Sequence, residues 1–142
     1  MIKLLFLSLF ISSSGFAATL LMHKSDASGF VPPEFRFFKS CNIYREGYAS
    51  IKIVRANRPT QYYTRYFSRP VNLYIQGLLR AARYGRIESV PAVCDAGSKL
   101  LYGYQNNWRF ILDENKDCVS HYVNKSPATA YLKQRATAIC TF

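Results

Sequence analysis

The chain has 142 residues, a length that fits one domain of ordinary size. Hydrophobic residues make up 49% of it, which is typical of a packed globular protein and too high for a disordered chain. Lysine and arginine total 19 against 8 aspartates and glutamates, so the formal net charge at pH 7 is +11. These values exclude a multidomain machine, a low-complexity chain and a bundle of membrane helices, but they do not name an activity.

Residues 1–17 have the three parts of a signal peptide. Lys3 makes the start positive, Leu4–Ile11 is a mostly apolar run, and the small residues Gly15 and Ala17 stand where a signal peptidase requires them. The apolar run is much shorter than the ~20 residues that a membrane span needs. We therefore expect cleavage after Ala17, a mature chain without a transmembrane segment, and a secreted or periplasmic location.

The four cysteines all follow the predicted cleavage site. An even number of cysteines in an exported protein predicts disulfides, here two. No two of them have the two-to-four-residue spacing of a structural zinc site, so the sequence predicts no metal site, and nothing in it suggests a cofactor. Three pairings are possible. We favour Cys94–Cys118 together with Cys41–Cys140, because the second pair would tie the first predicted strand to the end of the chain.

The beginning of the mature chain shows no sustained periodicity. Residues 18–34 include Gly29 and the pair Pro32-Pro33, so we expect a flexible N-terminal tail ahead of a single domain over residues 35–142. Alternating apolar residues and a Tyr- and Thr-rich segment then predict a β-meander. Its three strands are Phe35–Ile43, Tyr48–Arg55 and Gln61–Phe67.

A helix is predicted next. Ser68 and Pro70 form a start signal, and Gly85 fits the left-handed position beyond the end. The apolar residues between them recur at helical spacing and form one stripe. These residues are Val71, Tyr74, Ile75, Leu78, Leu79 and Ala82.

The second half repeats the order of strands followed by a helix. We expect a loop over Ile87–Gly97, a hairpin of Lys99–Tyr104 and Trp108–Leu112, a polar turn over Asp113–Asp117, and a strand over Cys118–Val123. Ser126-Pro127 then starts a second helix. The β-branched residues near its end leave open whether residues 136–142 continue the helix or form a strand. The predicted fold class is α+β: antiparallel β-meanders, stapled by disulfides, with two amphipathic helices packed on the sheet.

Positive charge is concentrated in the first half. Between Arg36 and Arg86 there are eleven basic residues and one acidic residue, Glu46. Cations interleaved with aromatic rings suit an anionic partner, because guanidinium groups pair with phosphates or sulfates and rings stack on bases or sugars. The expected anion-binding residues are Arg55, Arg58, Tyr62, Arg65, Tyr66 and Arg69. The alternative is a solvated strand edge, whose basic side chains discourage aggregation and whose rings fill a core.

The sequence contains no motif that links a nucleophile to a base, so we expect a non-enzymatic binding domain. The candidate anionic partners are an envelope polymer, a glycan and an acidic protein, and the sequence specifies neither which of them binds nor the oligomeric state. One alternative is an inhibitor of a protease or another enzyme, acting through the apolar Val90–Cys94 segment. A second alternative is a small phosphodiester hydrolase that uses His121, since His23 lies in the expected tail.

Overall fold

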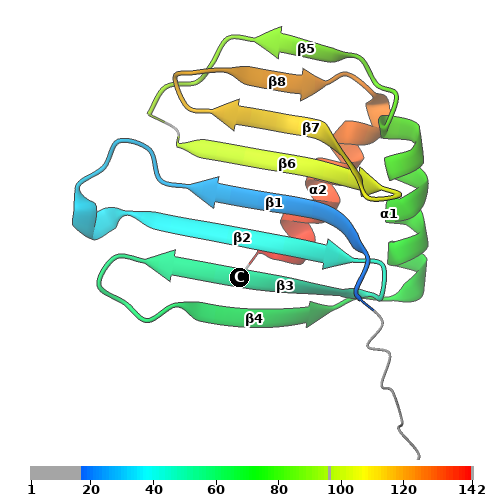
Figure 1. Cartoon of the computed structure of the whole chain (residues 1–142), viewed down its shortest axis with the longest axis horizontal. Coiled ribbons are helices and arrows are strands. Elements are labelled where there is room, and N and C mark those ends of the chain that lie inside the picture. Colours follow the sequence, from blue (N-terminus) through cyan, green and yellow to red (C-terminus); the bar gives the residue numbers. More distant parts are fainter. Residues whose placement is uncertain (1–16, 96, 142) are drawn as a thin grey trace, which may run out of the picture.

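Eight antiparallel strands form one sheet, and both α-helices pack on the same face of it (Figure 1). The structure is a computed structural model that describes residues 17–95 and 97–141, and the elements counted here belong to those residues. The strands are β1 (Leu20–Ala27), β2 (Phe37–Tyr44), β3 (Tyr48–Arg55), β4 (Gln61–Tyr66), β5 (Ile87–Val90), β6 (Ser98–Gln105), β7 (Trp108–Lys116) and β8 (His121–Asn124). The helices are η1 (Pro33–Phe35, a short 3₁₀ helix), α1 (Arg69–Ala82) and α2 (Pro127–Cys140). The predicted α+β class is therefore confirmed.

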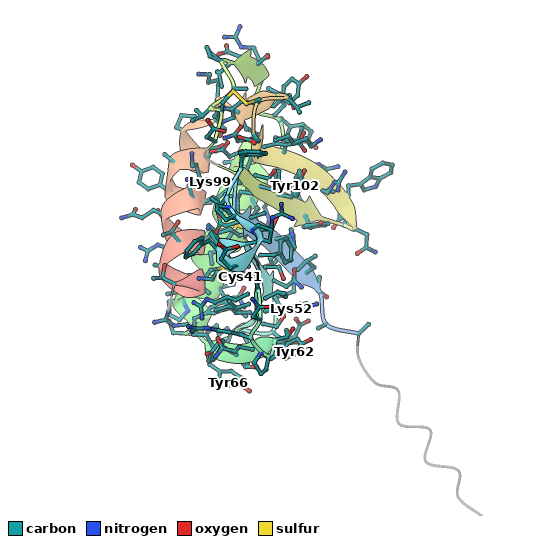
Figure 2. All side chains as sticks on the ribbon, turned by 90° about the vertical axis from the view of Figure 1, so that its left-hand side faces the viewer. Cys41, Lys52, Tyr62, Tyr66, Lys99 and Tyr102 are labelled. Atoms are coloured by element: carbon teal, nitrogen blue, oxygen red, sulfur yellow. A yellow bond between two sulfur atoms is a disulfide. The ribbon has the colours of Figure 1, made fainter. Side chains whose placement is uncertain are left out.

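Each half of the chain contributes four strands and a helix, and β1 joins the halves. The strand order across the sheet is β4-β3-β2-β1-β6-β7-β8-β5, with β1 antiparallel to both β2 and β6. Figure 2 shows the sheet edge-on, with the helices on one side and the labelled Tyr102, Lys52 and Tyr62 on the other. We call these two sides the helix face and the open face.

The expected flexible tail is wrong for Leu20–Ala27, which form β1 at the centre of the sheet. Two features hide this strand from pattern analysis. A bulge between Leu20 and Met22 places two consecutive residues, Leu21 and Met22, in the core. Further along, the positions on the helix face hold Lys24 and Asp26, which pair with each other and break the apolar alternation.

The second half also differs from the prediction in three places. Ile87–Val90, expected as part of a loop, form the edge strand β5, which pairs with β8. The expected polar turn over Asp113–Asp117 is mostly strand, because β7 continues to Lys116 and buries Glu114 and Asn115. Correspondingly, β8 begins at His121 instead of Cys118. A run of polar residues predicts a turn, but Glu114 is accommodated in the strand by its contacts with Tyr102 and Lys116.

The second helix continues through its β-branched residues to Cys140. A helix end leaves its last carbonyl groups without partners. Here Arg65 on β4 donates from Nη1 to the carbonyl oxygens of Ala138, Ile139 and Thr141 at 3.0, 3.4 and 2.9 Å. This cation at the negative end of the helix dipole stabilises the last turn, so residues 136–140 are helical.

The core lies between the helices and the middle of the sheet. From the apolar stripe of α1, Ile75, Leu79 and Ala82 are buried, whereas Tyr74 is exposed. Gly103 on β6 makes room for this packing, because a Cβ atom there would lie 2.8 Å from Leu79 Cδ2 and 2.5 Å from the Phe110 ring. The helix therefore packs closely on the sheet.

Leu79→Ala is expected to lower the free energy of unfolding by about 2–5 kcal/mol, because it leaves a cavity in the core. Leu79 is 2% exposed, whereas Leu73 on the same helix is 57% exposed. The matched variant Leu73→Ala should change stability by less than about 1 kcal/mol. Urea unfolding followed by circular dichroism measures both, and equal effects would contradict the assignment of the core.

Both favoured cysteine pairs are confirmed: Cys41 is bonded to Cys140, and Cys94 is bonded to Cys118. The first bond attaches the end of α2 to β2 on the helix face. The second joins the β5–β6 loop to the turn before β8. Disulfides of this kind are typical of proteins that fold in an oxidising, extracytoplasmic compartment.

The two disulfides are expected to contribute unequally to stability. Their sequence separations are 99 and 24 residues. Chain entropy then predicts that Cys41→Ala/Cys140→Ala costs about 4.7 kcal/mol and Cys94→Ala/Cys118→Ala about 3.5 kcal/mol. Guanidinium unfolding of the two double variants tests this order, and the reverse order would contradict it.

Intact-mass measurement should show the gain of four hydrogens when the two bonds are reduced.

Candidate functional site

A groove lies on the helix face, at the end of the sheet that α2 does not cover. Cys41 and its neighbour on β3, Ile51, are buried beside the end of α2. The next inward positions toward the end of the strands are Lys39, Ile53 and Gln61, which are neighbours across β2, β3 and β4. They belong to a cavity of about 620 Å³ that also includes η1 and the β3–β4 turn. We call it the basic groove.

The walls of the basic groove combine positive charge with aromatic rings. Its charged residues are four cations and one acid: Arg36, Lys39, Arg55, Arg58 and Glu34. Its aromatic residues are Phe35, Phe37 and Tyr63, all of them exposed. The arrangement suits an anion that also presents an apolar or flat surface to the rings.

None of these four cations is neutralised by a carboxylate within salt-bridge distance. The ion pairs found in the described part of the chain involve other cations, namely Lys24, Arg86, Lys116, His121, Lys125 and Lys133. Arg55 donates instead to the neutral amide of Gln61, with Nη1 3.4 Å from Oε1. Burial and the charge of Lys24 lower the pKa of Lys39, against the opposite influence of Asp26. The groove therefore carries a net positive charge, and its one acid, Glu34, forms no ion pair with the four cations.

The six residues expected to bind an anion do not lie together. Arg55 and Arg58 line the basic groove. Arg65 caps α2 through its carbonyl contacts, and Arg69 begins α1. Tyr62 and Tyr66 alternate with Arg65 along β4, so they lie on the open face, and Figure 2 shows Tyr62 there.

Sequence reasoning missed half of the groove's cations. Arg36 and Lys39 belong to the first predicted strand, in which Lys39 interrupts the alternating apolar residues. In the structure this lysine lines the groove. A lysine on the apolar face of a predicted strand was the available signal for this groove. Its meaning could not be recognised from the sequence, because the sequence does not show that α2 ends before it reaches this lysine.

A second, smaller cavity of about 290 Å³ lies between α2 and strands β1, β6 and β7. Lys24 pairs there with Asp26, and Lys133 on α2 pairs with Asp113. Lys99 also lines the cavity, and Figure 2 shows it near the helix side of the sheet. Most of the charge in this cavity is internally compensated, in contrast to that in the basic groove.

The two histidines lie on opposite faces of the sheet. His121 Nε2 is 2.9 Å from Asp113 Oδ1, so Asp113 is its partner. Its other ring nitrogen, Nδ1, is buried without a partner. His23 is in β1, with Nδ1 2.6 Å from Asn42 Oδ1 on the open face. The histidines therefore do not converge on one substrate.

The Val90–Cys94 segment, through which the alternative inhibitor would act, is partly in the sheet. Val90 is the last residue of β5 and pairs with His121. Pro91 and Val93 are exposed beyond it, and Cys94 is held by its disulfide. Pro91, Val93 and Cys94 are thus the exposed residues of the segment, whereas Val90 and Ala92 are half-buried.

On the open face, a buried hydrogen bond joins Tyr102 on β6 to Glu114 on β7. Burial and this bond raise the pKa of Tyr102 to about 12. Burial by itself would raise the pKa of Glu114, but the Tyr102 hydroxyl and Lys116 outweigh it and lower that pKa. These contacts of Glu114 link β6 to β7 through their side chains.

Tyr102→Phe is expected to destabilise the protein at neutral pH by about 1.5–3 kcal/mol, because it removes a hydrogen bond to a buried carboxylate. The folded-state pKa of Glu114 is lowered, so its contribution is present above the unfolded pKa and is lost as the pH falls through the folded pKa. The difference between variant and parent should therefore shrink in acid. Thermal melts from neutral to acid pH measure it. Tyr104→Phe, on the same strand, is the control, and a pH-independent difference would contradict the assignment.

No protein family, curated protein or solved structure matches this chain. Within residues 17–95 and 97–141, no three side chains among His, Cys, Asp and Glu are grouped as metal ligands would be. None of the helices in the part of the chain that the structure describes is long and apolar enough to cross a membrane. The functional argument therefore depends on the groove itself.

Proposed function

We propose that the protein is an exported, non-enzymatic binding protein whose basic groove holds an anionic partner. The observation that carries the proposal is the set of four cations, without carboxylate partners, around one cavity. A protein gains little by collecting uncompensated charge at one place, since like charges repel. A bound anion would remove this repulsion and stabilise the folded state.

The export part of the proposal is supported by two independent features. The first 17 residues have the pattern of a signal peptide, and the mature chain carries two disulfides. In a secreted or periplasmic setting, the available anions include the phosphates and acidic sugars of cell envelopes. These groups fit the guanidinium and ammonium groups of the basic groove.

A binding role also fits the surroundings of the histidines better than a catalytic one. General acid–base catalysis needs a titratable nitrogen within reach of substrate. The free ring nitrogen of His121 is buried, and His23 is occupied by Asn42 on the other face. The basic groove contains Glu34 but no histidine.

Arg55→Ala/Arg58→Ala is expected to weaken retention on heparin-coupled resin, which serves as a soluble-polyanion probe. Each lost phosphate-like contact should make the slope of log affinity against log salt less steep by about one unit, so the double variant should lose about two. Affinity at low salt should fall roughly tenfold or more. Salt-gradient elution and titration at several salt concentrations measure both quantities.

The matched control is Arg69→Ala/Arg80→Ala, which removes the same charge from exposed positions on α1. This control should keep most of the affinity, because α1 lies at the other end of the sheet from the basic groove (Figure 1). Equal losses in both double variants would mean that the total charge matters and the groove does not. Salt-independent retention, or none, would overturn the proposal.

A further inference from the structure

We propose that the end of the molecule next to the basic groove docks on an anionic phospholipid membrane surface, with Phe30 and Phe35 inserted among the lipids. The inference rests on the proposed function, because it identifies the anion at the groove as lipid phosphate. The docking surface consists of the β1–β2 connection, the middle of the β5–β6 loop and the β7–β8 turn. Figure 1 shows all three at one end of the sheet, together with the β3–β4 turn.

Each of these three connections carries an exposed apolar side chain. Phe30 and Phe35 in the β1–β2 connection are 95% and 69% exposed. Val93 in the β5–β6 loop is 52% exposed, and Val119 in the β7–β8 turn is 84% exposed. Single exposed apolar residues are ordinary on protein surfaces, but several at the tips of neighbouring loops mark an interaction site.

Covalent and steric contacts hold the three connections in place relative to one another. The Cys94–Cys118 disulfide links the β5–β6 loop to the β7–β8 turn. The β1–β2 connection touches the same loop, since a Cβ atom on Gly29 would lie 2.7 Å from the carbonyl oxygen of Asp95 and 2.8 Å from the amide nitrogen of Gly97. The apolar tips are therefore presented by a tied unit and lose little conformational entropy on binding.

Cations flank the apolar tips. Arg36 directly follows Phe35, and Arg55, Arg58 and Lys39 lie in the adjoining basic groove. The acids nearby are fewer: Glu34 in the groove, Asp95 in the β5–β6 loop and Asp117 in the β7–β8 turn. Rings that enter the headgroup region, bordered by arginines and lysines, are characteristic of proteins that bind anionic membranes from one side.

The chemistry of the tips favours a lipid surface over a nucleic acid. A nucleic acid would use the rings beside the arginines for stacking and would need polar groups for its bases and sugars. Val93 and Val119 have neither rings nor hydrogen-bonding groups, and Phe30 stands almost fully in solvent at the tip of its loop. All of these apolar side chains would leave water if they were buried among lipid acyl chains, which is favourable for each of them.

Vesicles of equimolar phosphatidylglycerol and phosphatidylcholine are the probe. Co-sedimentation of the exported protein is expected with these vesicles and not with pure phosphatidylcholine. Phe30→Ser should reduce the binding roughly tenfold or more, because it removes one inserted ring. Tyr84→Ser, which removes another highly exposed ring (83%) beyond the end of α1, should leave the binding unchanged.

The single tryptophan gives the orientation. Trp108 is exposed in the β6–β7 hairpin, whose turn lies at the other end of the sheet (Figure 1). Its emission should stay unshifted when vesicles are added. In the double variant Phe30→Trp/Trp108→Phe, the new tryptophan should shift to shorter wavelength as it leaves water. A shift of Trp108 in the parent protein, with none at position 30, would overturn the inference.

The outcomes also separate this inference from the proposed function. Binding to heparin that depends on Arg55 and Arg58, with no binding to the vesicles, would refute membrane docking and leave the anion groove standing. Loss of both would refute both. Binding of single-stranded DNA that is weakened by Phe30→Ser, without vesicle binding, would replace the lipid with a nucleic acid.

Discussion

The attachment of α2 to β2 through Cys41–Cys140 decides which part of the sheet remains uncovered. The helix packs against α1 and the middle of the sheet, and its last turn is fixed both by the disulfide and by the three carbonyl contacts of Arg65. Because α2 ends there, the next inward residues on β2, β3 and β4 have no helix above them. The basic groove exists because the helix is anchored short of the strand ends.

The remaining surfaces can be compared with that groove. In the neighbouring cavity, Lys24 and Lys133 are matched by Asp26 and Asp113. On the open face, the side chains interact mainly with one another: the rings of Tyr44 and Tyr48 stack with centroids 4.7 Å apart, and Arg109 lies 4.7 Å over the ring of Tyr102. The basic groove gathers four cations without ion-pair partners around one cavity, which is why the proposed anion site is placed there.

Much of the architecture could be predicted from local signals. The start of α1 follows from Ser68 and Pro70, the hairpin of β6 and β7 from alternation around a polar turn, and the disulfides from an even cysteine count in an exported chain. β1 could not be predicted, because its inward residues Lys24 and Asp26 depend on each other for neutralisation. Charged residues in a sequence normally predict a solvent-exposed segment. Two residues of opposite charge that pair with each other can nevertheless be accommodated on the covered face of a sheet.

The positive charge of the candidate site could be predicted from the sequence, but most of the residues that form it could not. The excess of basic residues in the first half indicated an anionic partner, and Arg55 and Arg58 do line the groove. The other expected residues were separated by strand alternation, since Tyr62 and Tyr66 lie on the face opposite Arg65. Arg36 and Lys39 could be assigned to the site only once the position of the end of α2 was known. That position depends on contacts between residues far apart in the sequence.

The central position of β1 has a consequence for how the chain reaches its native state. During synthesis β1 can form a ladder with β2 almost at once, but β6 is made only after α1 and β5. Until then, one hydrogen-bonding edge of β1 has no native neighbour and is open to strands of other molecules. The nascent chain therefore passes through an interval of aggregation risk that ends when its second half arrives, and the rate of that non-local pairing sets how long the interval lasts.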